Sequence, residues 1–222
     1  PIAPTNLELW MACPHAYFVR HVLGVNPVEE PGDLFEISAA DRGNLIHAAL
    51  DRFHREVIDG QLPQPDPPGW LNLHWVRLAE LFDEVADEYE ATGRTGRAAA
   101  WRVDRRNLLT DLHQWFAHDS HRVQASGATV VRSEERFGGD SSVRLPIGNG
   151  RTVAVHGQID RIDRAANGDL LVVDHKTGSA RDFATITADD PTAGGTKFQL
   201  PAYAAGAIAI VGEQAPVRAE YS

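Results

Sequence analysis

Two acidic residues and a lysine near the end of the chain have the types and spacing of a cation-binding site. Asp160 ends the segment VAVHGQID, Asp174 follows the apolar run LLVV fourteen positions later, and Lys176 stands two residues further on. Carboxylate oxygens are the ligands that hard divalent cations prefer, and a nearby ammonium group can stabilise charge on a phosphate. The three residues therefore suit chemistry on a phosphate ester, provided that the fold brings them together.

The Asn-Gly pair between these segments predicts a β-hairpin that would do so. If residues 166–168 form a three-residue loop with Gly168 in the left-handed conformation, Asp160 pairs directly with Asp174. Because strand side chains alternate, Asp160, Asp174 and Lys176 then share one face of the sheet. A two-residue loop would shift the register by one and send the two acids to opposite faces.

The same charges could instead belong to the solvated face of an ordinary strand, with Lys176 simply pairing with Asp174. Four consecutive apolar residues, LLVV, indicate a strand that is covered on both faces. An acid at the end of such a strand is costly unless it is paired or binds a metal ion. We therefore favour the metal site over the solvated face.

Four motifs in a fixed order resemble the PD-(D/E)XK nuclease superfamily, specifically its RecB-like branch. They are the helical segment RGNLIHAAL with His47, GQIDRID at residues 157–163, DHKTG at 174–178, and Gln199 with Tyr203. The opening segment NLELWMACPHAYFVRHVLGV is also similar to the start of nuclease domains in AddB-type and AdnAB-type helicase–nucleases. One motif would be a weak signal, but four in this order make a specific one.

The resemblance implies a metal site of known composition. Its ligands would be His47, Asp160, Asp174 and the main-chain carbonyl of His175, and they would hold Mg²⁺ or Mn²⁺. These donors suit either ion better than zinc. Lys176 would orient a water molecule or stabilise the transition state. Without the resemblance, His47 would be taken for one of several helix-surface histidines among the ten in the chain.

Two further residues are implied as substrate-binding positions. Gln199 and Tyr203 are four residues apart and so lie on one helix face, from which they would contact nucleic acid or support the site. For Tyr203, packing in the core is an equal alternative. Glu134 or Glu135 could add an acid from an earlier strand, or simply be charge at a strand edge. We expect the five tryptophans mainly in the core, and we expect His113, His118 and His121 on a helix surface rather than in a zinc cluster.

Many AddB-like relatives hold an iron–sulfur cluster through one early and three late cysteines. This sequence has Cys13 at the early position and no second cysteine. Four thiolates cannot come from it, so we expect no iron–sulfur cluster in this chain. Either this branch has lost the cluster, or the late cysteines lie beyond residue 222. A single cysteine excludes an internal disulfide and suits a reducing cytoplasm.

Charge and hydropathy limit the remaining possibilities. The 222 residues carry a net charge of −10, whereas affinity for DNA normally rests on neutralising phosphates with cations. We expect the chain to hold DNA weakly by itself and to depend on a helicase or translocase, as partner or fused domain, to deliver the strand. No run of 18 apolar residues occurs and no signal peptide is evident, so no membrane association is expected.

The expected architecture is a single α/β nuclease domain, with a mixed sheet flanked by helices and a helical lobe. N-terminal helices with the histidine motif would occupy residues 1–60, the lobe 61–121, and the catalytic sheet with the Gln/Tyr helix 122–222. A capping box starting at Thr5 predicts the first helix. The other expected elements are helices at 39–58, 71–91, 98–118 and within 197–211, strands at 128–137, 142–146, 151–163 and 170–176, and loops at 25–37 and 61–69.

The function that these features predict is metal-dependent hydrolysis of DNA, on single strands and from an end, by the nuclease module of a recombination or repair helicase–nuclease. One alternative is a non-catalytic DNA-binding or scaffold module on a nuclease fold, and another is a stand-alone RecB-like exonuclease. The complete set of His47, Asp160, Asp174 and Lys176 favours an enzyme, because decay usually removes one such residue.

Overall fold

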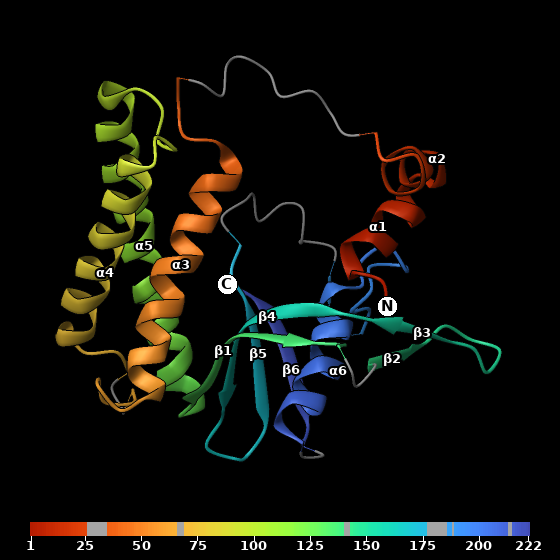
Figure 1. Ribbon diagram of the computed structural model, residues 1–222. Helices are drawn as coiled ribbons and strands as arrows, with labels where there is room; N and C mark the ends of the chain where they lie inside the picture. Colours follow the sequence, from red (N-terminus) through yellow and green to blue (C-terminus); the bar gives the residue numbers. More distant parts are fainter. Residues whose placement is uncertain (26–34, 66–68, 140–142, 177–185, 188, 213–214) are drawn as a thin grey trace.

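A four-stranded mixed sheet forms the centre of the computed structural model, which describes all residues except 26–34, 66–68, 140–142, 177–185, 188 and 213–214 (Figure 1). The strand order is β1-β4-β5-β6, with antiparallel pairing from β1 to β5 and parallel pairing between β5 and β6. The strands are β1 (Thr129–Phe137), β4 (Gly157–Arg164), β5 (Leu170–Asp174) and β6 (Val217–Tyr221). The predicted mixed sheet flanked by helices is confirmed.

The hairpin between β4 and β5 has the predicted three-residue loop. Ala165 N donates to Asp169 O at 2.9 Å, so residues 166–168 make the turn, and Gly168 has a φ of +89°. Arg161 lies opposite Val173. The same register, carried one residue further, puts Asp160 opposite Asp174. The local sequence therefore sets the register on which the site depends.

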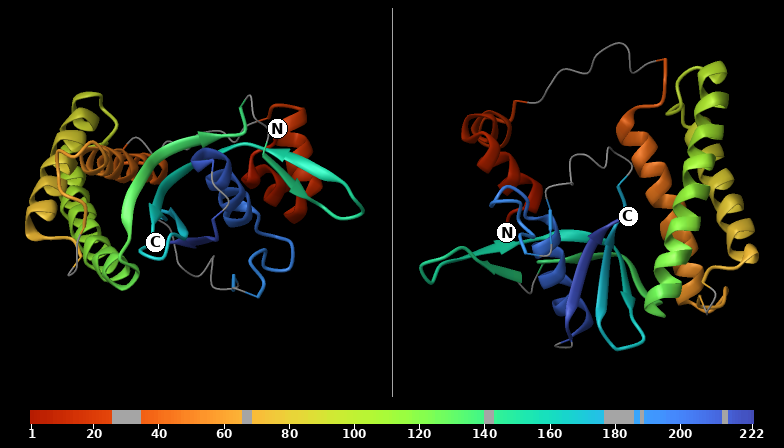
Figure 2. Two further views of the ribbon diagram at one scale, coloured as in Figure 1. Left: turned by 90° about the horizontal axis from the view of Figure 1, so that it is seen from below. Right: turned by 180° about the vertical axis from the view of Figure 1, so that it is seen from behind.

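Three long helices pack side by side along one flank of the sheet (Figures 1 and 2). They are α3 (Ala39–Ile58), α4 (Asn72–Ala91) and α5 (Ala98–Ser126). The side chain of Ser38 caps α3 by accepting a hydrogen bond from Asp41 N at 3.0 Å. An apolar stripe of α3, formed by Ile46, Ala49, Leu50, Phe53 and Val57, is buried with the inner faces of α4 and α5, and Trp70 and Trp101 lie in this core. None of the described helices is both long and apolar enough to cross a membrane.

Helix α6 (Gln199–Val211) packs against the sheet on the side away from the long helices and closes a second core around Ile159, Ile162 and Ala207 (Figure 1). The N-terminal helices α1 (Pro4–Ala12) and α2 (Pro14–Tyr17), with the π-helix η1 (Phe18–Val22), lie near the other end of the sheet. A small hairpin of β2 (Val143–Pro146) and β3 (Thr152–Val155) projects beyond them.

Several expected boundaries were wrong. The capping box at Thr5 does not form, because Pro4 occupies the first helical position and Ala3 is the cap. The helix expected at 98–118 continues to Ser126, where Gly127 ends it in the left-handed conformation. Strand β6 was not expected at all. Most of the expected loop at 25–37, part of the linker at 61–69 and the motif residues 177–178 lie outside the described residues.

The expected strand over 151–163 is two strands that belong to different sheets. Ile2 N donates to Ala154 O at 2.9 Å, and His156 N donates to Ile2 O at 3.2 Å. These bonds tie β3 to the N-terminus, while β4 turns away after His156 to join the main sheet. A contact with the start of the chain, more than 150 residues away in sequence, lies at the point where this segment divides.

Candidate active site

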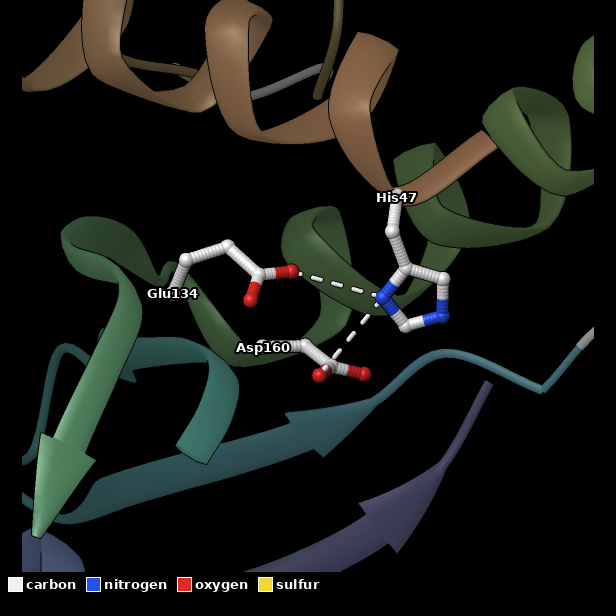
Figure 3. A group of neighbouring side chains, drawn as sticks. All are labelled: His47, Glu134 and Asp160. Atoms are coloured by element: carbon white, nitrogen blue, oxygen red, sulfur yellow. Dashed lines mark hydrogen bonds and ion pairs between the residues drawn. The ribbon is translucent and has the colours of Figure 1, made fainter. Parts of the chain in front are cut away.

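Side chains from a helix and two strands converge above the sheet. His47 points down from α3 toward Glu134 of β1 and Asp160 of β4 (Figure 3). Its Nδ1 lies 3.3 Å from Glu134 Oε1 and 3.6 Å from Asp160 Oδ1. One ligand atom from each residue lies within 4.8 Å of the other two. Among the described residues, His47, Glu134 and Asp160 are the histidine and acid side chains that lie close enough together to share one metal ion.

His47 reaches the sheet because it follows Ile46 on the flank of the buried stripe of α3. Its Nε2 lies 3.1 Å from the main-chain oxygen of His175, just beyond β5. Burial by itself would lower the pKa of His47. The hydrogen bond to Glu134 and the charges of Asp160, Glu134 and Asp174 outweigh that effect, so the pKa is raised. The negative charges around the imidazole would also favour the binding of a cation.

Glu134, rather than Glu135, is the acid that β1 contributes. Its backbone has a φ of +50°, which non-glycine residues rarely adopt, and β1 changes register between Val130 and Arg132. The side-chain amide of Gln158 donates to Glu134 Oε2 at 2.5 Å and fixes the carboxylate. Backbone strain of this kind concentrates at functional sites. The run EER gave no signal that would choose between the two glutamates.

Asp160 is buried and carries a strongly perturbed carboxyl group. The main-chain N–H of His175 donates to its Oδ2 at 2.7 Å. Burial and then the charge of Asp174 raise the pKa of Asp160 to about 7, despite the opposing influence of His47. The carboxylates of Asp160 and Asp174 are both buried and repel each other. A divalent cation bound between them would relieve this repulsion.

Asp174, Lys176 and Gln199 form a second set of contacts next to the first. Lys176 Nζ lies 2.5 Å from Asp174 Oδ2. The amide of Gln199 donates to Asp174 Oδ1 at 3.0 Å and accepts from Lys176 Nζ at 3.0 Å. Burial raises the pKa of Asp174, although Lys176 counteracts it. The carboxylate of Asp174 is therefore engaged by Lys176 and Gln199 and is not part of the close group of His47, Glu134 and Asp160.

Tyr203 combines the two interpretations that the sequence left open. It is buried against Phe137, yet its hydroxyl accepts a hydrogen bond from Gln199 Nε2 at 2.9 Å. Two neighbours were not expected. The ring of Tyr221 on β6 lies 5.2 Å from Lys176 Nζ. The carboxylate of Glu8 accepts from Gln199 N at 3.2 Å and from the preceding amide at 2.7 Å, which caps α6 from α1.

A buried network of charges lies behind the site and holds β4 against the helices. Arg161 is fully buried and donates to Asp163 at 2.7 Å and to Asp119 of α5 at 2.8 Å. It also contacts His54, whose ring stacks on His175 with centroids 5.8 Å apart. The main chain of His175 in turn touches His47 and Asp160. The network therefore supports His175, whose main chain contacts both His47 and Asp160.

The donor set fits a hard divalent cation. Carboxylate oxygens, a main-chain oxygen and one imidazole are donors that suit Mg²⁺ or Mn²⁺, whereas structural zinc sites use mostly cysteine and histidine. An open cavity of about 750 Å³ exposes His47, Glu134 and Asp160 to solvent. Its walls come from α3, β1, β4 and α6, and they include Asn44, Arg136, Gln158 and Tyr203.

We expect metal binding to depend on pH through Asp160. With its folded-state pKa raised to about 7, Asp160 keeps a proton that the unfolded chain has already lost. Its contribution to the stability of the metal-free protein is therefore present at low pH and is lost as the pH rises from about 4 to about 7. Mn²⁺ must displace this proton, so its affinity should rise with pH up to about 7 and then level off.

Isothermal titration of Mn²⁺ into wild type and Asp160→Asn, between about pH 5.5 and 8.5, checks this expectation. Asp160→Asn should bind the ion weakly and with little change across that range. His113→Asn, on the exposed face of α5, is the control and should retain the wild-type profile. Affinity in the wild type that does not change with pH would contradict the expectation.

These features define a class of protein: a mixed α/β sheet carrying clustered acids, a lysine and a helical histidine. A family model described as the PD-(D/E)XK nuclease superfamily matches residues 1–222, and the chain belongs to that superfamily. Several similar curated proteins are each named as one subunit of an ATP-dependent helicase/deoxyribonuclease. The relative from Clostridioides difficile is 24% identical over 186 residues, which are 79% of this chain and 15% of the relative.

Two further relatives have the same name. The protein from Symbiobacterium thermophilum is 27% identical over 185 residues, covering 78% of this chain and 15% of its own length. The protein from Streptococcus pneumoniae is 30% identical over 166 residues, covering 73% of this chain and 13% of its own. The chain thus spans about one seventh of the length of these relatives.

Proposed function

We propose that this chain hydrolyses phosphodiester bonds of DNA with a divalent metal ion, as the nuclease module of a recombination or repair helicase–nuclease. The observation that carries the proposal is the convergence of His47, Glu134 and Asp160 at 3.3–3.6 Å, beside the Asp174–Lys176 pair. Superfamily membership supports a nuclease, and the names of the relatives support DNA as the substrate and a helicase as the partner.

The residues that would hold Mg²⁺ or Mn²⁺ are His47, Asp160, Asp174 and the carbonyl of His175, with Glu134 as an additional acid. A divalent ion supplies charge neutralisation for the phosphate and lowers the pKa of water. Asp174 is oriented for such a role by Gln199, which also holds the ammonium group of Lys176. Lys176 would then stabilise the negative charge that develops on the phosphate during attack.

Gln199 and Tyr203 would serve the site from α6 rather than bind DNA independently. Gln199 bridges Asp174 and Lys176, and Tyr203 steadies its amide. Tyr203 also contributes to the lining of the cavity. We propose single-stranded DNA ends as the substrate and exonucleolytic cleavage as the mode, in the cytoplasm.

The alternative from another class is a non-catalytic DNA-binding or scaffold module. The strained backbone of Glu134 and the raised pKa of Asp160 argue against it, because both cost stability and neither is needed to hold a scaffold together. A stand-alone exonuclease would use the same residues. It would differ from the module only in cleaving DNA efficiently without a translocating partner.

We expect the isolated chain to cleave single-stranded DNA weakly and only with a divalent metal. The net charge of −10 opposes capture of the strand, so activity should fall steeply as salt increases and should rise on addition of, or fusion to, a DNA translocase. Cleavage of a labelled oligonucleotide with Mn²⁺, Mg²⁺ or EDTA, at several salt concentrations, measures this. Cleavage that persists in EDTA would refute the metal-dependent mechanism, and nanomolar binding at physiological salt would refute the need for delivery.

The same preparation tests the absence of an iron–sulfur cluster. Cys13 is exposed, and its Sγ accepts a hydrogen bond from Ala16 N at 3.4 Å, so here it caps α2. Cys13→Ser keeps an acceptor at this position and should change the melting temperature little. Iron found by elemental analysis, together with broad visible absorbance that Cys13→Ser abolishes, would overturn the expectation.

A further inference from the structure

The cavity above the candidate metal site is lined by two arginines whose surroundings differ. Arg55 of α3 donates from Nε to both carboxylate oxygens of Asp51, at 2.8 and 2.9 Å. Arg136 of β1 donates from Nε to the amide oxygen of Gln158 at 3.3 Å. Within the described part of the chain, no carboxylate pairs with Arg136. The charge of Arg55 is therefore neutralised by its neighbour, and that of Arg136 is available to a ligand.

The remaining charge around this cavity is negative. Asp51, Glu134 and Asp160 all line it, in a chain whose net charge is −10. A phosphate-containing strand is repelled by such a surface unless cations offset it. An exposed guanidinium offers paired N–H groups that match two phosphate oxygens, and it stays charged at any physiological pH. Among the cavity's cations, Arg136 alone combines exposure with a free charge in the described structure.

Arg136 is also tied in position to the acids of the site. Arg136 and Gln158 lie directly opposite each other in the pairing of β1 with β4. Gln158 accepts from Arg136 and donates to Glu134 Oε2 at 2.5 Å, so one amide bridges the guanidinium and the acid. The guanidinium is thus held at a set position relative to His47, Glu134 and Asp160. A guanidinium in a fixed position that binds one phosphate of a strand determines which phosphodiester bond of that strand lies at the acids.

We infer that Arg136 binds a phosphate of the DNA strand next to the one that is cleaved, and that Gln158 positions it. This inference rests on the proposed function and adds a substrate-binding position to it. The scissile phosphate would lie at His47, Glu134 and Asp160, and the neighbouring phosphate at Arg136, both in the same cavity. Arg136 is then a substrate-binding residue that acts on affinity and register, while the hydrolytic step belongs to the acids and Lys176.

The test compares Arg136→Ala, Arg136→Lys and Arg55→Ala with wild type. Fluorescence anisotropy of a labelled single strand in EDTA measures binding without hydrolysis, and steady-state cleavage with Mn²⁺ measures KM and kcat. Arg136→Ala should weaken binding and raise KM about tenfold or more, because a charged hydrogen bond to phosphate is lost. The slope of log affinity against log salt should fall by about 0.7, the value for one contact on a single strand. The kcat should stay within about twofold of wild type.

The other two variants decide whether the effect is specific. Arg136→Lys keeps the charge without the planar fork and should restore the salt slope but only part of the affinity. Arg55→Ala, in the same cavity, should change affinity less than about twofold, because its charge is already paired. Equal losses for Arg55→Ala and Arg136→Ala, or an unchanged slope in Arg136→Ala, would overturn the inference. Failure of wild type to cleave any DNA would instead refute the proposed function, since the binding measurement does not depend on cleavage.

Discussion

Lys176→Ala is expected to slow DNA cleavage by about 10²- to 10³-fold, the usual cost of removing one group that stabilises transition-state charge. Lys176 Nζ lies 2.5 Å from Asp174 Oδ2 and 3.0 Å from Gln199 Oε1, and both contacts hold the ammonium group in position. Its loss removes a charge aimed at the site without removing a proposed metal ligand. Mn²⁺ binding should therefore largely survive, and single-turnover cleavage at saturating Mn²⁺ measures the catalytic loss.

The choice of pH matters for this comparison. Lys176 holds down the pKa of Asp174, which burial raises, so Lys176→Ala will raise that pKa further. Asp174→Ala is the contrasting variant and should lose both metal binding and cleavage. Lys176→Ala and Asp174→Ala should both be assayed above about pH 8, where Asp160 has lost its proton. Equal and mild losses in the two variants would favour the scaffold interpretation.

Arg161→Met is expected to lower the free energy of unfolding by about 3–5 kcal/mol, the usual cost of removing one partner from a buried ion pair. Arg161 is fully buried between Asp119 and Asp163, and it holds the pKa of Asp119 below its ordinary range even though burial opposes this. Arg122 also contacts both acids, at 2.8 and 2.6 Å, and would compensate for part of the lost charge. The remaining negative charge is still uncompensated in the interior.

Urea unfolding at pH 7, followed by tryptophan fluorescence, measures this loss, which corresponds to a fall of roughly 6–20 °C in melting temperature. Arg132→Met is the matched control, because Arg132 is an exposed arginine on β1 and should change stability by less than about 0.5 kcal/mol. A loss below about 1 kcal/mol for Arg161→Met would show that Arg122 alone balances the two acids.

The sequence by itself determined the features that depend on near neighbours. A three-residue turn that contains the Asn-Gly pair set the register of β4 and β5, in which Arg161 lies opposite Val173, directly next to Asp160 and Asp174. The apolar stripe of α3, with Ser38 as cap, set the helix from Ala39 to Ile58 and put His47 on its flank. Turn geometry and helix periodicity act over a few residues, so the whole pattern is contained within the segment that it shapes.

Only the tertiary structure decided which other residues complete the site. Glu134 rather than Glu135 faces His47 because β1 takes a positive φ at that residue, a conformation that its contact with Gln158 and pairing with β4 support. The segment from Arg151 to Asp163 divides at His156, whose main-chain N–H donates to Ile2 near the start of the chain. Strand β6, which brings Tyr221 to Lys176, is held by parallel pairing with β5.

The buried charges show the same division. The motif GQIDRID predicted a functional role for Asp160. Nothing near Arg161 in the sequence indicated that its partner would be Asp119, 42 residues away. Whether a charged residue is exposed, paired in the interior or free to bind a ligand depends on which distant segments pack around it. Arg55 is paired locally, because Asp51 lies four residues away on the same helix and side chains at that spacing meet. Arg136 follows two glutamates directly in the sequence, yet its guanidinium contacts the amide of Gln158, which the pairing of β1 with β4 places opposite it.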